Sequence, residues 1–464
     1  MRDWLKREPI VIVRGKGAEL EDAHGRRYLD ANASIWTNLH GHRHPAMDRA
    51  VKAQLGKVAH TSALGLANEP AGLLAEKLVG AANRLRLRRQ PRLAKVFLSD
   101  DGSTAMEVAL KLAYEFARRT GRSAKPRFLS LRGAYHGDTV GAVSVGHIDL
   151  FHKAYAGMLF KTDAVMAPYC YRCPFNRAKA ERADAREYRK CNWECLGKVE
   201  KAFARRKNRG GNDGVGAGYA AMVVEPLMQG AAGMIPQPAG WLRKVAEIVR
   251  GNGAQLIADE VMTGFGRTGA GGGGELFACG HEGIRPDYLA LAKGLTGGYL
   301  PMAATLVTQE VFDAFLGEYA EFKTFFHGHS FTGNQLGAAA ANASLDLLAE
   351  AKSVRRRGEL EGELGVALTS LWRLRNVGDI RQVGLVAGVE LVRDWRTREA
   401  FALTERVGIR VCEAMSRRGV LTRPIGSVVV LMPPYCTTAR QVARMVRVLG
   451  EAIEEVLGTG GDEV

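Results

Sequence analysis

The sequence predicts an α/β protein, with a mainly parallel sheet in a large domain and a smaller α+β domain built from both ends of the chain. Two observations lead to this fold class. Short apolar runs alternate with amphipathic helical patterns, as parallel βαβ units require. Several of these runs also end on charged residues, and ligand sites in such sheets form at the carboxyl ends of strands. We expect 45–335 to form the large domain, and 1–44 together with 336–464 to form the small one.

The composition is that of an ordinary globular protein. Hydrophobic residues make up 46% of the 464 positions and charged residues 25%, and no segment approaches the ~18 uninterrupted apolar residues of a membrane span. The first residues carry no apolar signal-peptide core, so we expect a cytoplasmic protein. The net charge of +16 is spread along the chain without the aromatic-interleaved basic face of single-strand binders. We therefore expect neither nucleic acid nor a membrane as a partner.

The expected elements follow the same alternation along the chain. The expected strands are 10–13, 19–20, 28–29, 95–98, 127–131, 220–225, 255–258, 288–292, 386–391 and 428–431. The expected helices are 45–58, with Met47, Val51, Leu55 and Val58 on one stripe, 70–81, one through 109–116, 241–250, 336–351 and 405–417. The glycine run at 270–274 is expected to be a flexible loop.

The strand expected at 288–292 ends on a lysine. Burial disfavours the charged form of an amine, so Lys293 is costly at this place unless its amine has a use. Gly294, Gly297 and Gly298 follow and allow the backbone to turn tightly against a ligand. These features favour a nucleophilic amine that forms a Schiff base with an aldehyde. A lysine that reaches along the surface to solvent is the alternative.

Two further expected strands end on acids, Glu225 and Asp259. Because the carboxyl ends of parallel strands meet at one edge of a sheet, we expect both acids to lie close to Lys293. Tyr135 stands beside His136 between two glycines in the loop after another strand. An aromatic ring at this place suits stacking on a flat cofactor, and a turn with a packed tyrosine is the alternative.

The loop after the strand at 95–98 is rich in small residues. The backbone N–H groups of such a loop and of the following helix bind anions, so Gly102, Ser103 and Thr104 are candidate phosphate contacts. No P-loop lysine and no Gly-x-Gly-x-x-Gly is present here, so a nucleotide is not the favoured anion. Trp36 lies in a loop after the first strands and is expected to be an aromatic wall of the pocket.

These residue types together match the needs of pyridoxal 5'-phosphate. That cofactor requires a lysine for its aldehyde, an acid against its ring nitrogen, an anion site for its phosphate and a ring on which to stack. Lys293 supplies the first, and Asp259 keeps the ring nitrogen protonated. Once a substrate amine displaces it, Lys293 is a free base placed to move the proton of the substrate Cα.

A resemblance to class III (ω-type) aminotransferases is carried by two segments, Asp259-Glu-Val-Met-Thr-Gly-Phe-Gly-Arg-Thr-Gly269 and Lys293-Gly-Leu-Thr-Gly-Gly298. The similarity extends from about Ile10 to the C-terminus. It implies fold type I of pyridoxal-phosphate enzymes, with a sheet of the seven-stranded type. It also implies that the protein transfers amino groups between small molecules as a homodimer with active sites at the subunit interface.

From the residues and the resemblance together, we expect Lys293, Asp259 and Tyr135 to be catalytic. The expected cofactor contacts are Gly102, Ser103, Tyr135, His136, Glu225, Asp259 and Lys293, with His329 and Ser330 reaching the phosphate of the neighbouring subunit. The expected substrate contacts are Trp36, Tyr135, Lys293, Gly328 and Arg423, the last on the carboxylate of a keto acid.

Segments 36–42, 326–330, 423–426 and 431–435 resemble one branch of the family, in which the amino donor is S-adenosylmethionine or lysine. Ile35 and His329 stand where many members have tryptophan and proline, as in members that use lysine, so lysine stays open as the donor. We expect S-adenosylmethionine, because it is the commoner donor in this branch. Many members also carry a segment before the position of Met1. An ω-aminotransferase for a diamine, β-alanine or an amino-aldehyde is the alternative function, and a cofactor-carrying protein without turnover is a further one.

Four of the seven cysteines form an uneven quartet, Cys170-x2-Cys173 and Cys191-x3-Cys195, near the spacing of a zinc site. The second pair is one residue wider than the usual pattern. Free thiols in a reducing cytosol are therefore the favoured interpretation, and a structural metal or a redox pair is the alternative. The segment between the pairs, 174–190, is charged and helix-prone and is expected to be a surface excursion.

Overall fold

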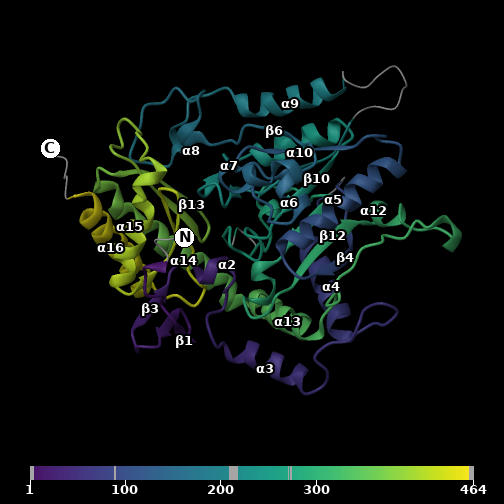
Figure 1. The fold of residues 1–464 in the computed structure, drawn as a ribbon, viewed down its shortest axis with the longest axis horizontal. Coiled ribbons are helices and arrows are strands. Elements are labelled where there is room, and N and C mark those ends of the chain that lie inside the picture. The colour runs from purple at the N-terminus through teal and green to yellow at the C-terminus, as the bar shows by residue number, and fades with distance from the viewer. Residues whose placement is uncertain (1–4, 88–89, 208–217, 270, 272–273, 459–464) are drawn as a thin grey trace.

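A computed structural model describes residues 5–87, 90–207, 218–269, 271 and 274–458. Its centre is a seven-stranded sheet in the order β4-β12-β11-β10-β7-β5-β6 (Figure 1). Neighbouring strands run parallel from β11 through β10, β7 and β5 to β6, and β12 is antiparallel to both of its neighbours. The strands are β4 (Leu93–Ser99), β5 (Arg127–Leu131), β6 (Asp163–Val165), β7 (Tyr219–Val224), β10 (Gln255–Asp259), β11 (Tyr288–Leu291) and β12 (Ala303–Thr308).

Helices cover both faces of this sheet, so its central strands are buried on both sides. In β10, Leu256 and Ala258 pack into the apolar cluster that contains α10, while Ile257 points to the opposite cluster, which contains α5. This is why these strands appear in the sequence as continuous apolar runs. The helices of this lobe are α3 (Pro45–Leu55), α4 (Glu69–Ala82), α5 (Gly102–Arg119), α6 (Val140–Val145), α7 (Asp149–His152), α9 (Glu194–Lys207), α10 (Trp241–Gly251), α11 (Ala278–His281) and α12 (Gln309–Asp313).

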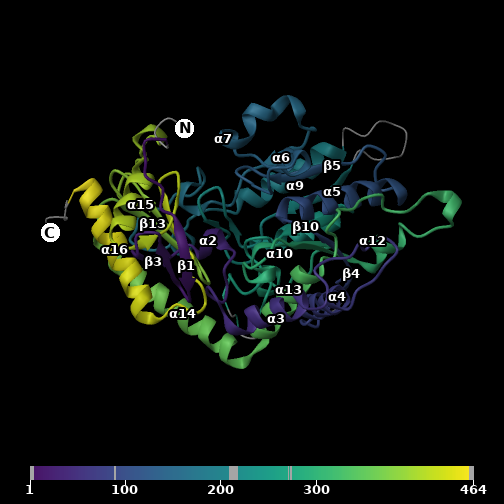
Figure 2. The same cartoon turned by 60° about the horizontal axis from the view of Figure 1, so that its bottom comes forward.

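A second lobe is built from N-terminal and C-terminal segments, whose purple and yellow ribbons lie on the left in Figure 2. β3 pairs in parallel with β15, so N-terminal and C-terminal segments share one sheet in the order β1-β2-β3-β15. A second sheet has the order β13-β14-β17-β16. The strands are β1 (Ile12–Lys16), β2 (Glu19–Asp22), β3 (Arg27–Asp30), β13 (Val377–Val383), β14 (Val386–Leu391), β15 (Val420–Leu421), β16 (Pro424–Ile425) and β17 (Val428–Leu431). The helices here and at the join are α13 (Gln335–Ala349), α14 (Ala351–Thr369), α15 (Val407–Arg417) and α16 (Ala439–Leu457).

The predicted fold class is confirmed, and the domain limits at 44/45 and 335/336 stay a prediction. Two helix predictions were wrong in part. The helix expected at 336–351 ends at Ala349, and α14 follows it after Glu350, whose extended backbone breaks the helix. In α3 the expected stripe is only partly buried: Met47 is covered, whereas Leu55 is 60% exposed in the single chain. The glycine loop at 270–274 lies largely outside the described residues.

The segment between the cysteine pairs also differs from the prediction. Only α8 (Ala185–Tyr188) is α-helical in 174–190, because this segment lies against the β13–β14 sheet and its arginines bind groups there. Arg186 donates to the backbone oxygen of Gln382 (2.7 Å), and Arg182 donates to the backbone oxygen of Val377 (3.0 Å). The segment is therefore docked on the second lobe. Within the described ranges, no helix is both long and apolar enough to cross a membrane.

Candidate active site

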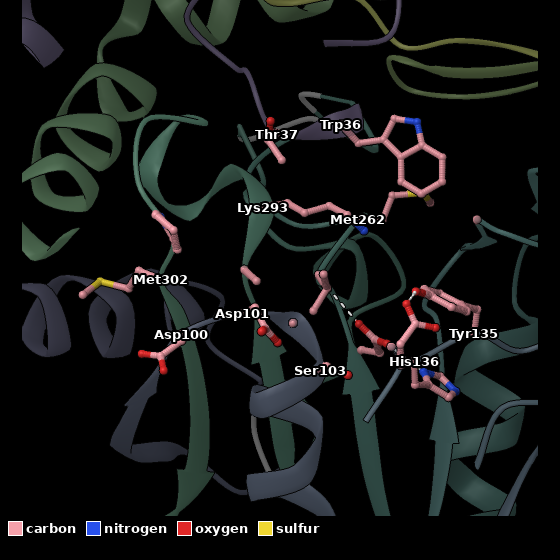
Figure 3. A pocket seen from close by; sticks show the side chains of 18 of the residues that line it. Trp36, Thr37, Asp100, Asp101, Ser103, Tyr135, His136, Met262, Lys293 and Met302 are labelled. Carbon is pink, nitrogen blue, oxygen red and sulfur yellow. Dashed lines mark hydrogen bonds and ion pairs between the residues drawn. The ribbon is translucent and has the colours of Figure 1, made fainter. Parts of the chain in front are cut away.

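A cavity of about 750 Å³ opens at the carboxyl ends of β5, β7, β10 and β11. Strand ends, the first turn of α5 and the segment after β3 supply its walls. Its lining includes Trp36, Gly102, Ser103, Tyr135, His136, Glu225, Asp259, Met262 and Lys293. The strand ends predicted to meet at one edge of the sheet therefore do converge on one site (Figure 3).

Lys293 follows directly on the end of β11. Ala292 leaves the strand, and Lys293 adopts a left-handed backbone conformation (φ 40°), which is rare for a residue with a side chain. Its amine lies inside the cavity, 4.9 Å from the centre of the Trp36 ring (Figure 3). Burial lowers the pKa of Lys293, and the carboxyl groups of Asp259 and Glu225 oppose that effect only in part. A neutral amine is both a nucleophile and a base.

Asp259 ends β10 and is only 5% exposed. Its Oδ2 contacts Nδ1 of His136 at 2.7 Å, and its Oδ1 accepts the N–H of Val261 at 3.0 Å. Burial alone would lower the pKa of His136, but the hydrogen bond and charge of Asp259 raise it above its usual value. Sequence reasoning placed His136 near the cofactor and missed its pairing with Asp259, since 123 residues separate the two.

Glu225 follows β7 and joins two loops of the cavity. Its Oε1 accepts the N–H of Tyr135 (3.2 Å), and its Oε2 accepts the N–H of Gly230 (2.8 Å). Burial raises the pKa of Glu225 to about 7. We infer that Glu225 holds the loop walls in place, because both of its oxygens are used by backbone groups.

The first turn of α5 forms an anion cradle. Asp101 caps the helix by accepting the N–H of Thr104 (2.9 Å). Among the described residues, the N–H groups of Gly102 and Ser103 have no acceptor, and both residues line the cavity. Gly137 is in close contact with this turn, because a Cβ there would lie 2.1 Å from Oγ of Ser103. Free N–H groups at a helix start suit a phosphate.

Two aromatic rings flank the Lys293 amine. Tyr135 lies on the loop after β5, where its hydroxyl donates to Asp138 (2.8 Å) and its ring stacks at 12° to that of His152. Trp36 lies opposite, 8% exposed, and its Nε1 donates to Asn32 (2.8 Å). In Figure 3 the Lys293 side chain runs between Trp36 on one side and Tyr135 with His136 on the other.

The segment that carries Trp36 was expected to be a loop, and the structure makes it a left-handed helical turn, labelled α2 (Ala33–Trp36). All four residues have positive φ, between 44° and 69°. A left-handed conformation costs about 1–2 kcal/mol for each residue with a side chain, so a turn of this kind requires strong local contacts. The residue types in 33–36 do not predict a left-handed turn.

Four expected site residues lie outside the cavity lining of the single chain. Gly328, His329 and Ser330 belong to the segment between α12 and α13, where the Ser330 oxygen accepts Nε2 of His60 (2.8 Å) and His329 lies 3.7 Å from Asp100. Arg423 is exposed between β15 and β16. Their contacts to cofactor and substrate stay predictions.

Other contributors to the cavity were missed by sequence reasoning. Thr139 donates its N–H to Oγ of Ser103 (3.0 Å), and Glu107 accepts the N–H of Gly141 (2.7 Å), so the loop after Tyr135 is tied to α5. The only feature of the sequence that could have indicated this link is the position of Glu107, one helical turn after Ser103 and so on the same face of the helix.

The four cysteines of the quartet are free thiols. In the part of the chain that the structure describes, no group of three or more His, Cys, Asp or Glu side chains is placed to hold a metal ion. The structure therefore gives no support to the zinc interpretation.

This fold and this site define a class of protein: an enzyme with a buried lysine in a sheet-edge cavity. The family model for aminotransferase class-III matches residues 2–453. The chain belongs to the class III aminotransferase family, and the predicted enzyme class is confirmed.

Individual relatives share almost the full length. Adenosylmethionine-8-amino-7-oxononanoate aminotransferase of Geobacter sulfurreducens is 48% identical over 461 residues, 99% of this chain and 95% of the relative. The crystal structure of the enzyme with that name from Methanocaldococcus jannaschii has a TM-score of 0.86 at 37% identity and covers 98% of this chain and 95% of that one. A PLP-bound amine transaminase from an uncultivated Pseudomonas species has a TM-score of 0.86 at 31% identity, with 97% and 96% covered.

Proposed function

We propose that this protein transfers an amino group to 8-amino-7-oxononanoate to give 7,8-diaminononanoate, a step of biotin biosynthesis, with S-adenosylmethionine or lysine as the donor. The observation that carries the reaction type is the buried Lys293 amine between Tyr135 and Trp36, with Asp259 and an anion cradle in the same cavity. The substrate is supported by the 48% identity to a relative of that name over 99% of the chain.

The cofactor is pyridoxal 5'-phosphate, and the residues present fit it. Free N–H groups at Gly102 and Ser103 suit its phosphate, Asp259 suits its ring nitrogen, and Lys293 holds it covalently. When bound, this cofactor withdraws electrons from the substrate Cα and so makes the Cα proton acidic. The solved Pseudomonas neighbour binds the same cofactor.

The protein's own groups then hold and move protons. Lys293 accepts the proton from the substrate Cα, because its amine lies in the cavity and burial lowers its pKa, which favours the neutral form. Asp259 keeps its charge directed into the cavity, because His136 and the N–H of Val261 fix both of its oxygens. Trp36 excludes water from the amine on one side, and Tyr135 provides a flat surface on the other.

The protein acts in the cytoplasm as a homodimer whose subunits share the active sites. The homodimer is supported by an apolar surface formed by 58–66 and 326–331, where Leu64 is 91% and Phe326 70% exposed in the single chain. His60 and Phe331 join the two segments, with ring centres 4.8 Å apart. Ser330 on this surface reaches the phosphate of the partner's cofactor.

Product analysis tests the activity. Purified protein is incubated with 8-amino-7-oxononanoate and either S-adenosylmethionine or lysine, and 7,8-diaminononanoate is measured by mass spectrometry. Lys293→Ala is expected to abolish product, and Lys352→Ala, an exposed lysine paired with Glu350, is the matched control with full activity. Turnover of β-alanine or a diamine without product from 8-amino-7-oxononanoate would contradict the proposed substrate.

Subunit complementation tests the shared site. Lys293→Ala and Ser330→Asp are each expected to be inactive as homodimers, and the mixed dimer is expected to regain activity because one of its two sites has both native residues. Full activity of Ser330→Asp alone would contradict a role at the phosphate.

A further inference from the structure

The left-handed turn at Ala33–Trp36 is closed by its own backbone. The N–H of Trp36 donates to the oxygen of Asn32, and the N–H of Thr37 donates to the oxygen of Ala33, both at 2.9 Å. None of these residues is glycine, so the conformation is not one that the segment favours by itself. Contacts from outside the turn must hold it.

Three of those contacts come from one carboxylate, Asp30, at the end of β3. Its Oδ1 accepts the N–H groups of Ser34 (3.0 Å) and Asn32 (3.3 Å), and its Oδ2 accepts the Ser34 hydroxyl (2.8 Å) and contacts Nε2 of His42 (3.2 Å). Asp30 is 3% exposed. Burial would raise its pKa, but the hydrogen bonds from His42 and Ser34 lower it, so the carboxylate is charged at neutral pH.

Asp30 is itself fixed by both ends of the chain. Its N–H donates to the oxygen of Ala18 (2.8 Å), and it lies beside Leu421 in the parallel β3–β15 pair. The turn leaves from this anchor and ends against Gly298, where a Cβ would lie 2.9 Å from the Asn38 backbone. If residues 33–36 formed a right-handed turn between Asp30 and the contact with Gly298, the Trp36 side chain would point in a different direction.

We propose that Asp30 is a positioning residue, which holds the left-handed turn Ala33–Trp36 and so keeps the Trp36 ring over the amine of Lys293 (Figure 3). Asp30 acts through Trp36 and touches neither substrate nor cofactor. The consequence for turnover rests on the proposed function, whereas the effect on the accessibility of the Lys293 amine does not.

The test is a double-mutant cycle on the chemical reactivity of Lys293. The full-length protein, freed of cofactor, is labelled with trinitrobenzenesulfonate, and peptide mass spectrometry gives the rates at Lys293 and, as an internal reference, at exposed Lys352. The variants are Asp30→Asn, Trp36→Ala and the double variant. Asparagine has one acceptor oxygen, so it can accept either from the backbone N–H groups that bind Oδ1 or from the Ser34 hydroxyl and His42 that bind Oδ2, but not from both sets.

Asp22→Asn is the matched control. Asp22 is also buried in the N-terminal sheet (4% exposed), and it likewise accepts two backbone N–H groups and one hydroxyl, from His24, Arg26 and Tyr28. It does not line the cavity. This variant therefore removes a comparable carboxylate from the same sheet without changing the turn at Trp36.

We expect labelling of Lys293 to rise about fivefold in Trp36→Ala, because the indole ring no longer covers the amine, and by a similar factor in Asp30→Asn. The double variant should match the single ones, because both changes remove the same cover. Hydrogen exchange in 31–38 should accelerate in Asp30→Asn and not in Asp22→Asn. Ser34→Ala, which removes only the hydroxyl contact, carries the same test if Asp30→Asn does not fold.

If the two single-variant increases in the Lys293 labelling rate multiply in the double variant, Asp30 acts independently of Trp36 and the proposal is wrong. If the labelling rate is unchanged in Asp30→Asn, Asp30 has no effect on Lys293 and the proposal is also wrong. Neither outcome depends on turnover. A wild-type protein without transamination would refute the proposed function, and the labelling cycle would still decide the role of Asp30.

Discussion

Replacing Asp259 with asparagine removes one negative charge from the cavity and keeps the volume of the side chain. The carboxylate is almost fully buried and binds His136 at 2.7 Å and the N–H of Val261 at 3.0 Å. An amide has one acceptor oxygen and a donor in place of the second, so one of these contacts is lost. The pKa of His136 also falls in the variant, because the hydrogen bond and charge that raise it are gone.

The size of the effect follows from this geometry. Removing one preorganised electrostatic group from a water-excluded site lowers kcat by about 10²–10³. Losing a hydrogen bond to a charged group lowers folding stability by about 1.5–3 kcal/mol. We therefore expect kcat of the donor half-reaction to fall by about 10²–10³ and the free energy of unfolding of the cofactor-free protein to fall by about 1.5–3 kcal/mol.

Rapid-mixing kinetics of the donor half-reaction measures the first quantity, and urea denaturation the second. Asp287→Asn is the control, because Asp287 accepts the N–H of Leu256 (2.8 Å) at the other end of β11, away from the cavity. It should lose stability without a selective loss of kcat. A fall in kcat of less than about tenfold in Asp259→Asn would refute the assigned role of its charge.

Three further predictions concern close packing, pH and a buried ion pair. Gly137→Ala should weaken binding of the phosphate-bearing cofactor at least about tenfold in spectroscopic titration, because its φ is 120° and the new Cβ meets Oγ of Ser103 at 2.1 Å. Burial raises the pKa of Glu260 to about 7, so the folded protein binds a proton there that the unfolded chain releases above its ordinary 4.5. The contribution of Glu260 to stability should therefore fall by up to about 3 kcal/mol as the pH rises from 4.5 to 7, and Glu260→Gln should reduce the slope in urea denaturation by that amount. Glu225, whose pKa is also raised to about 7, contributes a slope of its own. Arg381→Met should cost about 3–5 kcal/mol of unfolding free energy, because it leaves buried Asp379 without the guanidinium that contacts it at 2.9 Å and leaves Glu390 with Arg172 as its remaining arginine partner.

Each of these predictions has a matched comparison in the same chain. Gly157→Ala places its Cβ in open space and should leave cofactor binding unchanged. Arg393→Met removes an exposed ion pair and should cost less than about 1 kcal/mol. Equal costs for Arg381 and Arg393 would contradict the effect of burial, and a pH slope that is unchanged in Glu260→Gln would assign the whole slope to other groups such as Glu225.

The central sheet could be predicted because its strands are buried on both faces. β10 and β11 appear in the sequence as short apolar runs that end at Asp259 and Lys293, and the structure places both ends at one cavity. β12 was not predicted. It is antiparallel to both neighbours, and its run Ala303–Thr308 has no charged end to mark it.

Site residues were predictable where they follow the carboxyl end of a parallel strand, which we call the strand-end rule. They were not predictable where the contact joins residues distant in sequence. Glu225, Asp259 and Lys293 follow from the rule. The His136–Asp259 contact does not, because loops after different strands meet only in the folded sheet. The same applies to the docking of 174–190 on the second lobe, where arginines bind groups about 200 residues away.

The turn at Ala33–Trp36 fails local prediction for a different reason. Each residue there prefers a right-handed or extended backbone, so any rule based on residue preference assigns a loop. The left-handed turn forms because Asp30 binds both the N–H and the hydroxyl of Ser34. Asp30 itself lies in a sheet that combines strands from both ends of the chain. Local preference and global structure conflict at few places in a natural protein, and such places gather at functional sites because strain there is maintained by the surrounding contacts. The left-handed turn at α2 places Trp36 beside the Lys293 amine, the group that the strand-end rule predicted independently from the other side of the cavity.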